Sequence, residues 1–305
     1  MRLRYGIVGT GAVGGYYGGR LALGGNEVHF LHHSDYEYVK AHGLQIDSCN
    51  GDFHLDPIHV YSQTTDMPQC DVVLVCLKTT QNHLLPTLLP PLLHAHTLVI
   101  LVQNGIGMEG DLQACLPDVQ CAAGIAFICC AKTGPGHLKH ECNGSINIGN
   151  YSGRNARVLT QVVDDFNACG IEAHEMEYHE ARWKKAVWNM PFNGMSVLLH
   201  AHTQQLLGKE TEPLIRAQMQ EVIGAAIHLG VKGIDVSFAD KMISVTRAMV
   251  PCMPSMRLDW DNHRAMEIAY LYTRPIAKAR EAGFAMPKLE MLEQSLRFMA
   301  AYSGK

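Results

Sequence analysis

The stretch Gly9-Thr10-Gly11-Ala12-Val13-Gly14 decides the fold of this chain. It follows the apolar run Arg4–Val8 and opens the helix-like segment Ala12–Leu23, so it predicts a tight turn between a strand and a helix. In such a turn the first glycine permits the bend, the second lets the backbone approach a pyrophosphate, and the third allows close helix–strand packing. The N–H groups at the helix N-terminus also favour phosphate. We therefore expect all six residues to bind a dinucleotide.

Short apolar runs alternate with helix-like stretches through the first half of the chain. Nearly continuous apolar runs are typical of strands buried on both faces of a parallel sheet. The alternation predicts a Rossmann-type doubly wound parallel sheet. Strands are expected at Arg4–Val8, Glu27–Leu31, Asp71–Leu77, Thr97–Val102, Cys121–Ala131, Ser145–Ile148 and Gly170–His174, and helices at Ala12–Leu23 and Arg154–Ala168.

The strand signals stop near Tyr178, and helical patterns follow. Helices are expected at Glu180–Leu207, Thr211–Leu229, Phe238–Val250 and His263–Ala282. The predicted fold class is therefore α/β followed by an all-α C-terminal domain. We place the dinucleotide-binding domain at residues 1–176 and a helical substrate domain at residues 177–305.

Composition limits the classes of function. The 305 residues are enough for two cores, and 47% of them are hydrophobic. The net charge of −4 offers no basic excess, which argues against DNA or RNA as a partner. No apolar run is long enough to cross a membrane, and the N-terminus lacks a signal region, so we expect a cytoplasmic protein. The ten cysteines include no Cys-x-x-Cys pair, and we expect them to be reduced and structural.

The end of the second predicted strand bears on the choice of cofactor. A carboxylate at its tip would bind the ribose 2′-OH of NAD and repel the 2′-phosphate of NADP. Here the tip reads Leu31-His32-His33-Ser34, and Asp35 comes one step later. The missing acid favours NADP, the missing arginine weakens that preference, and His33 could contact the phosphate.

Two further polar residues follow predicted strands. Lys78 comes after the run Asp71–Leu77, and Asn104 precedes Gly105 after the run Thr97–Val102. Ligands bind at the carboxyl edge of such sheets, so both residues are candidates for cofactor contacts. An ordinary loop lysine and a turn-forming Asn-Gly pair are the alternative interpretations.

Lys185, Asn189 and Asn193 recur at four-residue steps and therefore form one row on a helix. Trp188 and Phe192 beside the row make a fully solvated face less plausible than a cavity lining. Glu267 is a lone carboxylate in an apolar stretch, and it could be exposed or could face Lys185.

The whole set resembles the ketopantoate reductase (2-dehydropantoate 2-reductase) family over nearly the entire chain. The resemblance is carried by the turn Gly9–Gly14, Lys78, Asn104-Gly105, the row Lys185, Asn189 and Asn193, and the pair Ser255 and Glu267. Two positions depart from the family pattern: His33 replaces a basic residue, and Gly194 follows Asn193 where the family often has proline.

The resemblance implies NADPH-dependent reduction of 2-dehydropantoate to pantoate, in pantothenate and coenzyme A biosynthesis. Lys185 is the candidate proton donor, since an ammonium can stabilise and protonate a developing alkoxide. By resemblance, Glu267 would be the second catalytic residue and would orient the substrate or hydrogen-bond its hydroxyl. Asn104, Asn189, Asn193 and Ser255 would bind the substrate. Asn104 and Glu267 are also expected to contact the cofactor.

Other interpretations stay open at this point. The chain could reduce another 2-keto acid, or it could be a non-catalytic NADP sensor. The group His137, His140, Glu141 and Cys142 could hold a metal, but its spacing is poor for zinc, and we expect no metal. The apolar helices of the second half could pair two copies in a homodimer.

Overall fold

The computed structural model of the chain describes residues 2–154 and 156–302. It divides into two compact units. The first comprises Met1–Gln103 and Glu109–Tyr178, and the second comprises Asn104–Met108 and His179–Lys305. The short segment Asn104–Met108 therefore belongs with the C-terminal helices, although in the sequence it lies within the first half of the chain.

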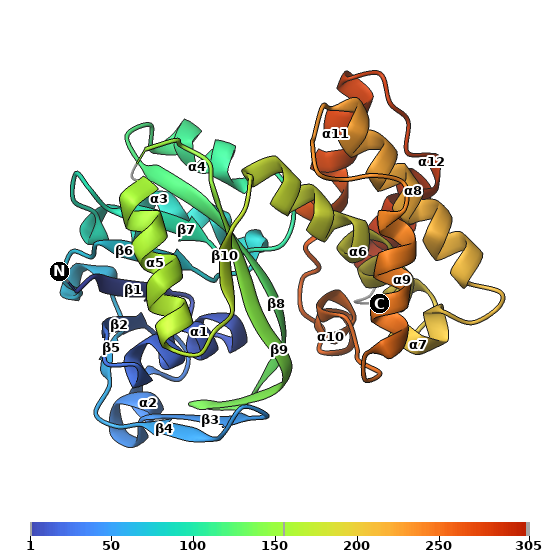
Figure 1. Cartoon of the computed structure of the whole chain (residues 1–305). Coiled ribbons are helices and arrows are strands. Elements are labelled where there is room, and N and C mark those ends of the chain that lie inside the picture. The colour runs from blue at the N-terminus through green and yellow to red at the C-terminus, as the bar shows by residue number, and fades with distance from the viewer. Residues whose placement is uncertain (1, 155, 303–305) are drawn as a thin grey trace. The chain divides into compact units, whose positions relative to one another are not determined.

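Within the described residues, the first unit is built on a ten-stranded sheet (Figure 1). The strand order is β4-β3-β9-β8-β7-β6-β1-β2-β5, and β10 lies beside β9. The bounds are β1 Arg4–Val8, β2 Glu27–Leu31, β3 Leu44–Ser48, β4 Phe53–Leu55, β5 His59–Tyr61, β6 Val72–Val75, β7 Leu98–Leu101, β8 Gln120–Gly134, β9 His137–Asn150 and β10 Ala173–Glu175.

The central strands run parallel, as the predicted Rossmann-type fold requires. Parallel pairing joins β5, β2, β1, β6, β7 and β8 in succession. The long strands β8 and β9 instead form an antiparallel hairpin, and β3 pairs antiparallel with β4. The α/β class with a helical C-terminal region is confirmed, and the sheet is wider than the sequence analysis predicted.

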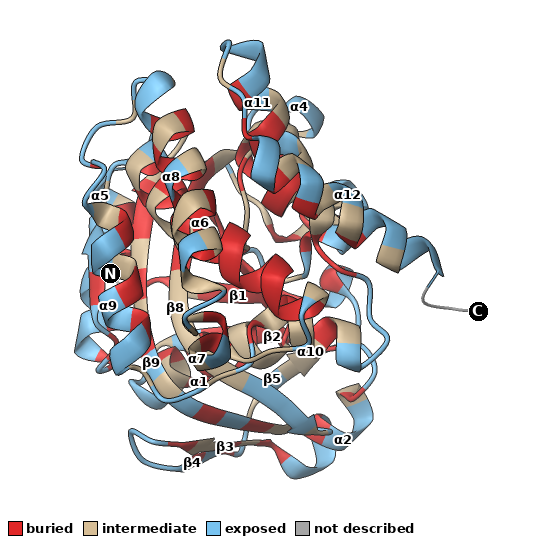
Figure 2. Ribbon diagram, turned by 90° about the vertical axis from the view of Figure 1, so that its right-hand side faces the viewer, coloured by how far each residue is buried: buried red, intermediate tan, exposed pale blue. Residues whose placement is uncertain are grey.

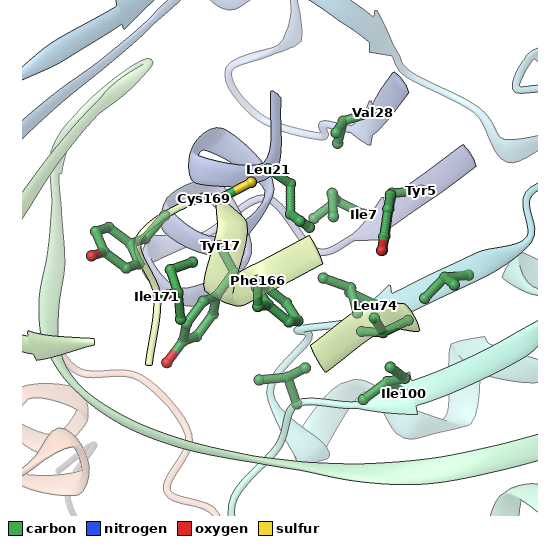
Figure 3. Close-up of a cluster of buried hydrophobic side chains, with 14 of the residues drawn as sticks. Tyr5, Ile7, Tyr17, Leu21, Val28, Leu74, Ile100, Phe166, Cys169 and Ile171 are labelled. Atoms are coloured by element: carbon green, nitrogen blue, oxygen red, sulfur yellow. The ribbon is translucent and has the colours of Figure 1, made fainter. Parts of the chain in front are cut away.

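Helices cover both faces of this sheet. Their bounds are α1 Ala12–Leu23, α2 Tyr36–His42, α3 Leu85–Leu88, α4 Met108–Cys115 and α5 Ala156–Ala168, with short 3₁₀ turns at Thr64–Asp66, Thr79–Leu84 and Pro90–Leu92. On one face Leu21 of α1 and Phe166 of α5 pack against strand residues such as Ile7 (Figure 3). On the other face Leu85 and Leu112 join a second buried cluster. This arrangement leaves the carboxyl ends of the parallel strands to carry a site.

The second unit is helical. Its elements are α6 Tyr178–Leu198, α7 Thr203–Leu206, α8 Glu212–His228, α9 Phe238–Ala248, α10 Ser255–Asp261, a π-helical turn η4 Ala269–Thr273, α11 Arg274–Glu281 and α12 Pro287–Tyr302. Its core includes Trp183, Phe192, Met219, Tyr272 and Leu292. Figure 2 shows how much of α6 is buried. None of the helices in the described part of the chain has both the length and the apolar character that crossing a membrane requires.

Two predicted helices are wrong in their extent. The helix expected at Glu180–Leu207 ends at Leu198, because His200 adopts a left-handed backbone with φ of 51°, and α7 begins only at Thr203. The helix expected at His263–Ala282 starts later. Residues 264–267 are not helical, and Pro275 lacks the N–H that would continue the regular ladder, so a π-helical turn precedes α11.

Eight of the ten cysteines are buried or half-buried, whereas Cys49 and Cys115 are exposed. All ten are free thiols, and Cys70 and Cys121 belong to the apolar cluster on one face of the sheet. Burial raises the pKa of both thiols to about 12, so neither is a reactive thiolate at neutral pH.

Candidate active site

The glycine-rich turn joins β1 to α1 as its sequence predicts. Gly9 has φ of 98°, and a Cβ atom there would lie 2.7 Å from the backbone nitrogen of Leu77. A Cβ on Gly14 would lie 2.4 Å from the Gly9 carbonyl oxygen. Only glycine therefore fits at these two positions, and the turn packs directly against the chain that follows β6.

Gly11 has a different surrounding. A Cβ at Gly11 would meet no protein atom within 4 Å, so the backbone here faces open space. Gly11 is also the N-cap of α1 and supplies no side-chain cap, so a ligand can take up the N–H groups at this helix start. These residues therefore fit a dinucleotide pyrophosphate. Its binding groups would be the backbone N–H groups of Gly11, Ala12, Val13 and Gly14.

The side chain of Thr10 has an internal role. Its hydroxyl donates a hydrogen bond to the Leu31 carbonyl oxygen at 2.9 Å, and the residue is buried. This bond fixes the turn to the end of β2. A contact of Thr10 with the cofactor would therefore come from its backbone.

After the end of β2, His33 and Asp35 differ in their exposure to solvent. His33 is exposed, whereas Asp35 is buried. The Asp35 carboxylate accepts hydrogen bonds from His32 Nδ1 at 3.0 Å and from the Gly136 N–H at 3.1 Å, and it pairs with Lys132 Nζ at 2.6 Å. His33 is thus the residue at this strand end that could meet a 2′-phosphate.

Lys78 lies at the same edge of the sheet. It is exposed and is the N-cap of the 3₁₀ turn Thr79–Leu84 that follows β6. Since β6 pairs in parallel with β1, Lys78 and the glycine-rich turn follow adjacent strand ends. Lys78 therefore has the position that a cofactor contact needs.

In the second unit, Lys185 lies on the long helix α6. Part of its side chain reaches solvent, but the ammonium end is desolvated, and this burial lowers its pKa from the usual 10.5 to about 8. The Nζ atom lies 5.8 Å from the centre of the Trp188 ring. An ammonium of this kind is protonated at neutral pH and gives up its proton more readily than an ordinary lysine.

Asn189 follows one turn later and contacts Asn104. Its Nδ2 donates to Asn104 Oδ1 at 3.2 Å. The segment that carries Asn104 is attached to η4, because the Ile106 N–H donates to the Tyr270 carbonyl oxygen at 3.0 Å. Gly105, with φ of 112°, lies so close to Tyr270 that a Cβ would come within 2.6 Å of the same oxygen. The structure thus brings Asn104 and Asn189 together.

Asn193 is buried and contacts the start of α10. Its Oδ1 accepts hydrogen bonds from the Met256 N–H at 3.0 Å and from Ser255 Oγ at 3.3 Å. The predicted substrate residues Asn193 and Ser255 therefore lie side by side. The Asn193 amide also satisfies an N–H group at a helix N-terminus, so it has a structural as well as a candidate binding role.

Glu267 is buried, with 4% of its surface exposed. It lies in the non-helical stretch just before η4, and its carbonyl oxygen accepts from the Leu271 N–H at 3.3 Å. One interpretation of the sequence was that Glu267 is an exposed helix residue, and that interpretation is wrong. A carboxylate with so little exposure needs compensating partners, which is typical of a site residue.

Tyr272 is a residue that the sequence analysis missed. It is fully buried, and its hydroxyl donates to the Met190 carbonyl oxygen of α6 at 2.6 Å. Burial raises the pKa of Tyr272, and a hydrogen bond from the Gly194 backbone acts in the opposite direction. A Cβ on Gly194 would lie 2.6 Å from this hydroxyl. Gly194 therefore makes room for Tyr272 beside the helix that carries Asn189 and Asn193.

The histidine-rich group on β9 has other contacts. His137 pairs with Asp47 at 2.8 Å, and the His140 ring packs on Tyr16 with ring centres 4.2 Å apart. Glu141 pairs with Lys139 at 3.1 Å. In the part of the chain that the structure describes, no three His, Cys, Asp or Glu side chains are grouped to hold a metal ion.

A Rossmann-type unit with an open glycine-rich turn, together with a helical unit that carries a desolvated lysine, defines a pyridine-nucleotide-dependent oxidoreductase. Comparisons with known proteins identify the family. Residues 5–153 match the family described as ketopantoate reductase PanE/ApbA, and residues 177–300 match its C-terminal counterpart. The chain belongs to the ketopantoate reductase family.

Individual relatives agree with this assignment. The chain is 40% identical to the 2-dehydropantoate 2-reductase of Nostoc sp., over 97% of this chain and 95% of that protein. The crystal structure of 2-dehydropantoate 2-reductase from Geobacter metallireducens superposes with a TM-score of 0.93 at 35% identity, covering 97% of this chain and 99% of that one. A D-mandelate dehydrogenase solved with NADH and anilino(oxo)acetate shares the fold, with a TM-score of 0.88 at 22% identity over 98% of both chains.

Proposed function

We propose that this protein reduces 2-dehydropantoate to pantoate with NADPH, a step of pantothenate and coenzyme A biosynthesis, and that Lys185 donates the proton. The observation that carries the proposal is the placement of Lys185, Asn189 and Asn193 at four-residue steps on the one helix α6. Burial of the Lys185 ammonium, which lowers its pKa to about 8, supports its role as donor. The 40% identity to a 2-dehydropantoate 2-reductase supports the choice of substrate.

The chemistry follows from the side chains. When bound, NADPH supplies a hydride to C2 of the keto acid. As the carbonyl oxygen gains negative charge, the Lys185 ammonium stabilises it and transfers its proton from Nζ. The product is a hydroxyl group, and Lys185 regains a proton from solvent for the next cycle.

The polar side chains around Lys185 would orient the substrate. The paired amides of Asn104 and Asn189, and the neighbouring Asn193 and Ser255, present donors and acceptors suited to a carboxylate and a hydroxyl. Glu267 would accept a hydrogen bond from the substrate hydroxyl. At the cofactor, the turn Gly9–Gly14 would hold the pyrophosphate, and His33 and Lys78 would contact its phosphates.

The test is the loss of NADPH absorbance after 2-dehydropantoate is added to the purified protein, with NADH and other 2-keto acids in parallel. We expect turnover with 2-dehydropantoate to exceed turnover with every other keto acid. A faster reaction with another acid would change the substrate assignment. Tight NADPH binding without any turnover would make the protein a sensor.

Two further expectations stay predictions. We propose that the enzyme works in the cytoplasm and that two copies form a homodimer. Fractionation of the native cells tests the location, and light scattering during size-exclusion chromatography measures the mass. A mass close to one chain across the working concentration range would contradict the homodimer.

A further inference from the structure

Asp35 lies four residues beyond the end of β2, close to the place where many dinucleotide-binding proteins select their cofactor. It follows β2 and comes about 20 residues after the glycine-rich turn, the distance typical of the acid that binds the ribose 2′-OH of NAD. Read from spacing alone, Asp35 would therefore favour NADH. The structure shows that its carboxylate is used differently.

Both carboxylate oxygens of Asp35 are engaged inside the first unit. Oδ1 accepts from His32 Nδ1 at 3.0 Å, while Oδ2 receives Lys132 Nζ at 2.6 Å and the Gly136 N–H at 3.1 Å. Only 6% of the side chain is exposed. Burial acts to raise the pKa of Asp35, but these contacts hold the pKa well below its ordinary value, so the group stays charged and paired.

The partners come from a part of the unit that is fixed against the glycine-rich turn. Lys132 and Gly136 belong to the end of the β8–β9 hairpin (Figure 1). In the same hairpin, Cys130 Sγ lies 3.5 Å from the Ala12 carbonyl oxygen. Leu138 packs so closely on α1 that a Cβ on Gly15 would meet it at 2.4 Å. The hairpin therefore holds Asp35 in place relative to the phosphate-binding turn.

Once Asp35 is held in this way, the strand end presents a different set of groups. His33 and Ser34 are exposed, and 31% of the Lys132 side chain remains accessible. These groups can donate hydrogen bonds to a phosphate, and Lys132 contributes a positive charge.

We propose that Lys132 is a cofactor-specificity residue that acts through Asp35: by holding this carboxylate inside the protein, it removes the acid that would bind the ribose 2′-OH of NADH and repel the 2′-phosphate of NADPH. The inference deepens the proposed use of NADPH and rests on it. The preference depends on an ion pair between β8 and the end of β2, in addition to any residue that touches the cofactor.

Two probes without a nicotinamide ring test this directly. We would measure the Kd of 2′-phospho-ADP-ribose and of ADP-ribose by isothermal titration calorimetry on the full-length protein. The wild type should bind the phosphorylated probe more tightly. In Lys132→Met the Asp35 carboxylate loses its cationic partner and should repel the 2′-phosphate. The Kd of ADP-ribose divided by the Kd of 2′-phospho-ADP-ribose should therefore fall by about tenfold or more.

Two further variants separate the charge of Lys132 from its hold on Asp35. In the double variant Asp35→Asn with Lys132→Met, no carboxylate is left to repel the phosphate. Most of the preference for 2′-phospho-ADP-ribose over ADP-ribose should therefore return. Asparagine also suits the N-cap position that Asp35 has before α2. The matched control is Lys139→Met, which removes an exposed lysine of the same hairpin that pairs with Glu141, and it should keep the wild-type ratio.

The outcomes are distinct. An unchanged ratio in Lys132→Met, or a double variant no better than Lys132→Met, overturns the role of Asp35. A wild type that binds ADP-ribose more tightly overturns the inference as a whole. These results are independent of turnover, so a protein inactive on 2-dehydropantoate would contradict the proposed function and leave the binding ratios to decide this inference.

Discussion

At the scale of single residues, Lys185 makes the most direct link between structure and chemistry. Burial lowers its pKa from 10.5 to about 8, so the protonated form still dominates at neutral pH. A proton donor works best when its pKa lies near the working pH. Under the proposed mechanism, the environment of this side chain therefore sets the pH range in which the enzyme can act.

We predict that kcat/KM falls about tenfold per pH unit above roughly pH 8, because only protonated Lys185 can donate. An ordinary lysine would keep its proton to beyond pH 10. A profile of kcat/KM against pH for the wild type measures this.

Lys185→Ala should lose about 10² to 10⁴ in rate while its affinity for NADPH is kept.

The adjacent residue provides a matched control. Lys184 pairs with Glu180 on the same helix, and Lys184→Met should keep both the rate and the pH profile. A wild-type profile that stays flat to pH 10, or full activity in Lys185→Ala, would rule out Lys185 as the donor.

Gly11 offers a test that separates ligand binding from folding. A Cβ at this position would have no protein atom within 4 Å, so Gly11→Ala should fold with almost unchanged stability. The added methyl group would occupy the space where a pyrophosphate approaches the backbone. We predict a Kd for NADPH weaker by about tenfold or more, since each 1.4 kcal/mol corresponds to a factor of ten.

The thermal stability of the unliganded Gly11→Ala protein is the control in this experiment. A variant that binds NADPH as tightly as the wild type would show that the cofactor does not approach this turn. A variant that has lost stability would show that Gly11 has a structural role that its open surroundings do not reveal.

At the scale of elements, the attachment of Tyr272 to α6 connects the core of the second unit to the row of candidate site residues. Its hydroxyl lies between the Met190 carbonyl and Gly194. We predict that Tyr272→Phe destabilises the protein by about 1 to 3 kcal/mol, because buried polar groups lose a partner. Because Asn189 directly precedes Met190 and Asn193 directly precedes Gly194, KM for the keto acid should also rise.

Denaturant unfolding and steady-state kinetics measure the two effects. Tyr38→Phe changes an exposed tyrosine of α2 and should change neither. A destabilised Tyr272→Phe with unchanged KM would show that the hydroxyl supports the core but does not position the asparagines.

The elements that the sequence predicts best are those with strong local signals. The strand, glycine-rich turn and helix over Arg4–Leu23 agree with the structure residue for residue, because turn chemistry and apolar runs coincide there. β4 and β5 were missed because three residues give no usable pattern. α12 was also missed, although Leu289, Leu292 and Leu296 recur at helical spacing and are fully buried.

The candidate site residues likewise differ in how far local sequence patterns predict them. Four-residue spacing places Lys185, Asn189 and Asn193 on one helix, and the structure keeps them there. The pairing of Asp35 with Lys132 joins residues almost 100 positions apart, and the contact of Asn104 with Asn189 spans 85 positions. Contacts of this kind come from tertiary packing, which no local pattern in one sequence reports.

At the scale of the whole molecule, the proposed site residues are divided between the two units. The turn Gly9–Gly14, His33 and Lys78 belong to the first unit, whereas Lys185, Asn189, Asn193, Ser255 and Glu267 belong to the second. Asn104 also belongs to the second unit, since its segment Asn104–Met108 is bonded to η4 and α6. Substitutions in the dinucleotide turn should therefore change cofactor affinity, and substitution of Lys185 should change proton transfer.

Ligand-dependent stability tests this division on the intact chain. A ligand that binds only the folded state at 100 times its Kd stabilises that state by about 2.7 kcal/mol. We predict that NADPH raises the melting temperature of the wild type and of Lys185→Ala by the same amount, because Lys185 is not part of the unit with the dinucleotide turn. At the same NADPH concentration, Gly11→Ala should show a much smaller rise. Loss of the shift in Lys185→Ala would mean that this lysine contributes to cofactor binding, and the separation of roles would then be wrong.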